Sequence, residues 1–170
     1  MPFSIFKTCT MSKALDARLK SQDLIDPEMV EAAIHFWFTD NQHLRSPFPA
    51  AIQAQLKDDA TEKFLDWGAK VPEKAKKELN DEILAEKFEE ILFEQAILLV
   101  KTEDEKLSIL YPFLPRLGDR IRVKDIPETE AESLVIAREY VKRDDHAFLK
   151  VQLRNEATGK EWETEFELPE

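Results

Sequence analysis

Residues 149–166 read LKVQLRNEATGKEWETEF, and in them charged and apolar residues alternate on both sides of a polar turn. The segment from Asn155 to Lys160 predicts that turn, with Gly159 where a positive φ is needed. If Asn155 lies opposite Lys160, a single register gathers opposite charges on one face and apolar residues on the other. The expected pairs are Arg154–Glu161, Gln152–Glu163 and Lys150–Glu165, then Leu153–Trp162, Val151–Thr164 and Leu149–Phe166. Since a slip of one residue would destroy both sets, we predict a β-hairpin with one buried face.

Two further strand-like runs precede the hairpin. Residues 119–125 alternate with period two, and residues 134–141 form a longer run that is partly apolar on both sides. We therefore predict that residues 113–170 form a small antiparallel β-meander or open barrel.

The front of the chain has helical periodicity instead. Asp26 is a good N-cap and Pro27 suits the first helical position, so a helix is expected over residues 27–38. A second helix is expected to start with Ser46 as its cap and to end near Gly68.

Weaker patterns predict a helix at 11–21 and another over 74–101. Residues 97–111 allow two interpretations, either a short helix that a capping box opens at Thr102 or a β-hairpin around an acidic turn. We favour the helix. The predicted fold class is α+β, with a helical lobe of three to five helices over 1–112 followed by an antiparallel β module over 113–170, although the two could form one compact domain.

Charge and composition limit the partners. The 170 residues carry a net charge of −11, and both halves are acidic, which disfavours nucleic acid or an anionic membrane unless a local basic patch outweighs the total. The single cysteine, Cys9, suits a reducing compartment. Because there is neither a run of about 20 apolar residues nor an apolar signal-peptide core, we expect a cytoplasmic protein without a membrane segment.

Motifs for catalysis or cofactors are missing from the sequence. The three glycines make no phosphate-binding loop, and we predict no cofactor and no metal. The glutamates at 82, 86, 90 and 94 are expected to be a solvated helix face, and Asp144, Asp145 and His146 a turn. His35 and His43 are the candidate acid or base residues if an enzyme site lies between the two lobes.

Basic residues after Leu117 are the one local exception to the acidity. If the two strands that carry them turn the same face outward, they would form a basic, aromatic-bearing surface that suits an anion or a phosphate backbone. The candidate binding residues are Arg116, Arg120, Arg122, Lys124, Arg138, Tyr140 and Lys142.

Three functions therefore compete. The leading hypothesis is a non-enzymatic protein-interaction or adaptor protein, because the helices have broad apolar faces that suit a protein partner or self-association. The alternatives are anion or nucleic-acid binding through the basic residues, and an enzyme with its site between the lobes.

Overall fold

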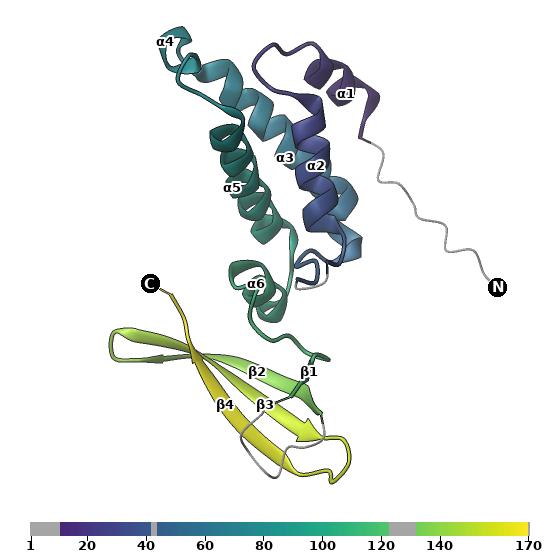
Figure 1. The fold of residues 1–170 in the computed structure, drawn as a ribbon, viewed down its shortest axis with the longest axis vertical. Coiled ribbons are helices and arrows are strands. Elements are labelled where there is room, and N and C mark those ends of the chain that lie inside the picture. The colour runs from purple at the N-terminus through teal and green to yellow at the C-terminus, as the bar shows by residue number, and fades with distance from the viewer. Residues whose placement is uncertain (1–10, 42–43, 123–131, 170) are drawn as a thin grey trace, which may run out of the picture. The chain divides into compact units, whose positions relative to one another are not determined.

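The structure is a computed structural model that describes residues 11–41, 44–122 and 132–169. The chain divides into two compact units, Met1–Pro112 and Phe113–Glu170. Along the described residues, six helices come first and four antiparallel strands follow, which is the predicted α+β class (Figure 1).

The first two helices agree with the sequence. Helix α1, Lys13–Lys20, lies within the predicted 11–21 segment. Helix α2, Pro27–Phe38, begins as predicted, because the Asp26 carboxylate accepts a hydrogen bond of 2.9 Å from the Glu28 N–H. Its buried residues Val30, Ile34 and Trp37 lie on the face that the helical periodicity selects.

Helix α3, Ala50–Lys70, starts later than the sequence predicts. Ser46 is not its cap; its hydroxyl donates to the Trp37 carbonyl at 2.6 Å. The reason is Pro49, whose ring disfavours helical dihedrals at the preceding Phe48. The helix ends at Lys70, close to Gly68 as predicted. A Cβ on Gly68 would lie 3.1 Å from Ile25 Cδ1, so glycine is needed there for close packing.

The helix predicted over residues 74–101 is two helices. They are α4, Glu73–Lys76, and α5, Asp81–Leu99. Asn80 separates them, and its side chain accepts a hydrogen bond of 2.9 Å from the Ile83 N–H at the start of α5. The hydrogen bond that an asparagine side chain accepts replaces one of the backbone hydrogen bonds of a continuous helix, so a new helix can begin after it.

Helix α6, Glu103–Leu110, decides between the two interpretations of residues 97–111. The Thr102 hydroxyl accepts from the Glu105 N–H at 3.1 Å, and the Glu105 carboxylate accepts from the Thr102 N–H at 3.0 Å. This reciprocal capping box confirms the helix, and the hairpin alternative is wrong.

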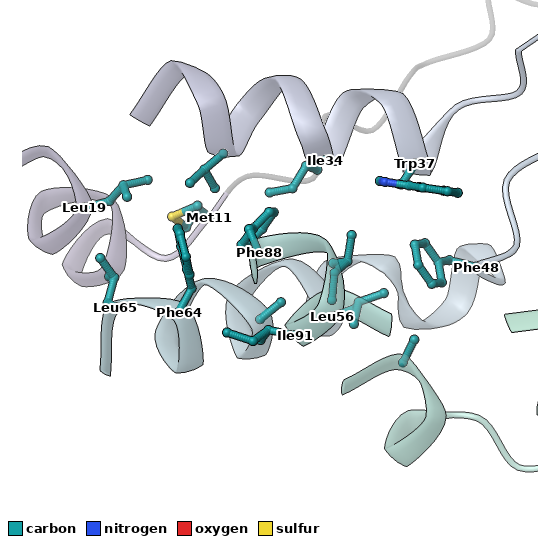
Figure 2. Close-up of a cluster of buried hydrophobic side chains, with 14 of the residues drawn as sticks. Met11, Leu19, Ile34, Trp37, Phe48, Leu56, Phe64, Leu65, Phe88 and Ile91 are labelled. Carbon is teal, nitrogen blue, oxygen red and sulfur yellow. The ribbon is translucent and has the colours of Figure 1, made fainter. Parts of the chain in front are cut away.

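The core of the helical unit lies among α2, α3 and α5. Figure 2 shows Trp37 and Phe48 at one end of the cluster, and Leu19, Met11 and Leu65 at the other. Phe64 and Phe88 are fully buried, with ring centroids 5.2 Å apart. Full burial of side chains of this size contributes about 1.5–3 kcal/mol each. The glutamates of α5 at 82, 86, 90 and 94 are exposed, which confirms the solvated face.

The β unit contains one antiparallel sheet in the order β1-β2-β3-β4. Its strands are Arg120–Ile121, Ser133–Arg143, His146–Asn155 and Glu161–Glu167. All six pairs predicted for the β3–β4 hairpin are present, from Arg154↔Glu161 to Leu149↔Phe166. Gly159 has a φ of 71°, as the predicted turn requires. The run predicted at 119–125 is described only as far as residue 122, and its strand β1 is two residues long.

Candidate functional site at the free edge of the sheet

The two faces of the β3–β4 hairpin differ in chemistry. Leu149, Val151 and Leu153 of β3 are buried, and their β4 partners on the same face are Phe166, Thr164 and Trp162. The opposite face carries the alternate residues of the same strands. These are Phe148, Lys150, Gln152 and Arg154 on β3, and Glu161, Glu163, Glu165 and Glu167 on β4. We call this second surface the charged face.

A β-bulge decides where the basic residues lie. The register between β2 and β3 shifts between Val135 and Ala137, so that Arg138 lies opposite Val151. If the side chains of β2 alternated strictly, Arg138 would lie on the same face as Leu134. Arg120 lies on that face too, because it pairs with Leu134. The extra residue reverses the sides after the bulge and places Arg138 and Arg120 on opposite faces.

The described members of the basic set therefore do not share one surface. Tyr140 and Lys142 lie opposite Leu149 and Ala147, on the same face as Arg138. Arg138 donates to the Pro115 carbonyl at 3.0 Å, and Arg120 Nε lies 3.3 Å from a carboxylate oxygen of Glu156 in the β3–β4 turn.

The other members of this set are dispersed as well. Arg116 is buried, and its backbone N–H donates to Asp119 at 2.8 Å. Arg122 is exposed just after β1, and Lys124 lies outside the described residues.

The histidine and acidic candidates do not come together in the described parts of the chain. His35 is exposed on α2, and His43 lies outside the described residues. Asp144 and Asp145 form the tight turn between β2 and β3, as predicted, with Asp144 at a φ of 50°. His146, which is predicted to lie in the same turn, is instead the first residue of β3 and pairs with Arg143. Among the described residues, no group of three or more His, Cys, Asp or Glu side chains is arranged to hold a metal ion.

Strand β4 is an edge of the sheet. Within residues 11–41, 44–122 and 132–169, it pairs with β3 alone. The Asn155 N–H donates to the Lys160 carbonyl at 2.8 Å, and the Leu168 N–H donates to the Ala147 carbonyl at 2.8 Å. In an antiparallel pair, such exchanging positions recur at every second residue.

These two bonds fix which backbone groups of β4 face outward. Trp162, Thr164 and Phe166 turn their N–H and C=O groups toward β3. The four glutamates, Glu161, Glu163, Glu165 and Glu167, turn theirs away from the sheet. The free edge is therefore a row of backbone donors and acceptors that belong to the glutamates. An edge of this kind can accept another strand.

Ion pairs hold the glutamate side chains on the charged face. Glu161 contacts Arg154 at 2.8 Å and Glu163 contacts Lys150 at 3.0 Å. Glu167 lies 3.0 Å from His146 Nδ1, a contact that is an ion pair only when the imidazole is protonated. Arg143 donates to Glu165 Oε2 at 2.7 Å. The sequence assigns Lys150 to Glu165 as its directly opposite partner. The backbone register agrees, but the ammonium contacts the diagonal Glu163 because the Arg143 guanidinium takes both oxygens of Glu165.

The same contacts shift the pKa values of these side chains. The hydrogen bond from Lys150 lowers the pKa of the Glu163 carboxyl, and that from Arg143 lowers the pKa of Glu165. The same two bonds raise the pKa of Lys150 and of Arg143. The carboxylates therefore stay ionised near neutral pH and keep the edge acidic.

Sequence reasoning predicted the hairpin but missed its outer edge as a candidate site. The available signal was the alternation of glutamate with Trp162, Thr164 and Phe166 in the last strand-like run of the sequence. Recognising an edge also requires the order of all strands in the sheet, which pairwise register does not supply.

Comparisons with known proteins add no relative. A scan against protein-family models, a search of curated proteins and a search of solved structures each find no match. In the part of the chain that the structure describes, none of the helices is both long enough and apolar enough to cross a membrane.

Proposed function

We propose that the chain is a non-enzymatic protein-interaction protein that binds an extended segment of a partner along β4. The observation that carries the proposal is the row of outward backbone groups on the 7-residue edge strand. In strand addition, the main-chain hydrogen bonds provide affinity and the alternating side chains provide specificity.

The contrast between the two edges of the sheet supports this proposal. Edge strands are commonly protected by being short, by charged side chains, by containing proline or by bulging away from a neighbour. The glutamates give β4 charge, which is the only one of these protections it has. The β1 edge is two residues long, which is one such protection. Strand β4 is longer, contains neither proline nor glycine, and keeps its register with β3 from Phe148↔Glu167 to Arg154↔Glu161 without a shift.

A cytoplasmic location belongs to the same proposal. A single cysteine at position 9 suits a reducing compartment, and the net charge of −11 favours a basic protein partner over nucleic acid.

Panning a library of random peptides against the full chain tests the proposal. We expect enrichment of extended sequences whose binding is lost in Glu163→Pro. Proline removes an outward N–H at this position but leaves the β3–β4 ladder intact, since proline is tolerated where the N–H faces solvent. Circular dichroism and the melting temperature of the variant serve as controls for folding.

Enriched peptides that bind Glu163→Pro as well as the parent chain would refute the proposal, because their site would not be the β4 edge. A library without any enriched binder would refute it equally. Turnover of a small substrate that a single histidine or glutamate substitution abolishes would replace it with an enzymatic function.

A further inference from the structure

The chemistry of the β4 edge also restricts what can bind there, and the inference that follows rests on the proposed function. Along β2, β3 and β4, the charged face carries the three cations Arg143, Lys150 and Arg154 among five carboxylates. Arg120 of β1 adds a fourth cation, which pairs with Glu156. The five carboxylates are Glu139 of β2 and the four glutamates of β4. The face is therefore acidic on balance, and the excess lies toward the outer edge.

A second copy of the same strand does not fit this edge. In an antiparallel pair, residues that exchange hydrogen bonds lie directly opposite each other. Because the outward groups of β4 all belong to glutamates, every antiparallel register between two copies places glutamate opposite glutamate. Like charges in that position destabilise the pair.

The other face of β4 suits a partner strand with apolar side chains. Trp162, Thr164 and Phe166 are half-buried, each with one side against β3 and part of its surface left open. An added strand would place every second side chain beside them and the intervening ones beside the glutamates. The hairpin already contains such a strand, since β3 alternates Lys150, Gln152 and Arg154 with apolar residues.

We propose that β4 selects an extended partner segment in which lysine or arginine alternates with apolar residues. The basic side chains pair with Glu161, Glu163, Glu165 and Glu167, and the apolar side chains pack beside Trp162, Thr164 and Phe166. The partner is thus a basic strand from another protein, with the same pattern that β3 supplies within the chain.

Fluorescence anisotropy with three labelled peptides as long as β4 tests this selectivity. The first alternates lysine with valine. The second alternates glutamate with valine. The third has the composition of the first, but its lysines are contiguous, so that it keeps the charge and loses the pattern. Each is titrated with the full chain and with Glu163→Pro.

Side-chain recognition is measured with the double variant Glu163→Gln/Glu165→Gln. Its matched control is Glu82→Gln/Glu86→Gln, which makes the same charge change at exposed positions of α5. We expect the alternating-lysine peptide to lose roughly twofold to thirtyfold in affinity for the first variant and to bind the control like the parent chain. Its affinity should also fall as salt is added, because the pairs lie at the surface.

The outcomes separate this inference from the proposed function. If the alternating-glutamate peptide or the contiguous-lysine peptide binds equally well and Glu163→Pro prevents it, the edge is a binding site but the partner class is wrong. If Glu163→Pro prevents the binding of none of the peptides, both proposals are wrong. Self-association of the chain that Glu163→Pro abolishes would replace the basic partner with a second copy.

Discussion

At the residue scale, Lys57 shows how the helical unit tolerates a buried charge. Its side chain is 8% exposed, and its ammonium lies 3.2 Å from a carboxylate oxygen of Glu31 on α2, which is 53% exposed. Removing the carboxylate leaves the ammonium with one less partner in a poorly hydrated place, whereas replacing the lysine removes the charge itself.

We therefore expect Glu31→Ala to lower the free energy of unfolding by about 1–2 kcal/mol, with the exposure of Glu31 limiting the effect. Lys57→Met should cost less than Glu31→Ala, because a flexible apolar side chain of similar length fills the same space. Urea denaturation of both variants measures the difference. A Lys57→Met variant that is less stable than Glu31→Ala would contradict this account of the pair.

A second residue-scale prediction concerns the start of α6. Thr102→Ala removes the hydroxyl that accepts from the Glu105 N–H, and we expect a cost of about 1 kcal/mol. The backbone N–H groups of Thr102 and Lys101 lower the pKa of the Glu105 carboxyl. A carboxyl with a lowered folded-state pKa stabilises the fold above its unfolded pKa, and this contribution is lost as the pH falls through the folded pKa.

Urea denaturation between pH 7 and pH 3 tests the role of Glu105. Glu105→Gln should be less stable than the parent at pH 7, and the difference should shrink toward pH 3. A difference that stays constant over this range would show that the carboxylate charge does not contribute.

At the element scale, the β3–β4 hairpin explains why part of the structure is predictable from sequence. Two independent patterns, charge and hydrophobicity, require the same register, so the backbone pairing follows. The ion pairs do not follow, because long side chains such as Lys150 reach diagonal partners. The bulge after Val135 contains no glycine that would have predicted it. This bulge alone places Arg138 and Arg120 on opposite faces of the sheet.

The helices show the same limit. Asp26 and Thr102 act as caps as predicted, because each has a single strong local signal. Helix α3 begins after Pro49 and not after Ser46, although Ser46 is the better capping residue by sequence. Asn80 separates α4 from α5, but a single asparagine is a weak signal within a long stretch of helical periodicity.

The ion pairs of β4 predict that the stability of the chain depends on pH. Because the pKa values of Glu163 and Glu165 are lowered in the folded chain, both carboxylates stabilise the strand above their ordinary pKa. That contribution should disappear as the pH falls through the lowered values. Melting curves of the parent and of Glu163→Gln/Glu165→Gln should therefore differ at pH 7 and converge in acid. Parallel curves at all pH values would contradict the ion-pair assignments.

At the scale of the whole molecule, the two units differ in how much apolar core each one encloses. The large cluster of buried side chains, from Met11 to Ile109, belongs entirely to the first unit. The second unit buries fewer apolar residues, among them Val135, Leu149, Val151, Leu153 and Leu168. A small core supplies little stabilisation to offset the ordering of the chain.

We therefore expect a fragment of residues 1–112 to keep its helical circular dichroism and to unfold cooperatively. A fragment of residues 113–170 should melt at a lower temperature than the first. Loss of cooperative unfolding in the first fragment would show that the helical unit depends on the rest of the chain.

Residue-resolved amide hydrogen exchange measures whether the backbone of β4 has a free edge that can bind a partner strand. In the free chain, the amides of Glu163 and Glu165 should exchange quickly, and those of Trp162, Thr164 and Phe166 slowly, because only the latter donate to β3. The alternating-lysine peptide should slow the two glutamate amides and leave the other three nearly unchanged. Slow exchange at Glu163 and Glu165 in the free chain, or no change on adding the peptide, would contradict the account.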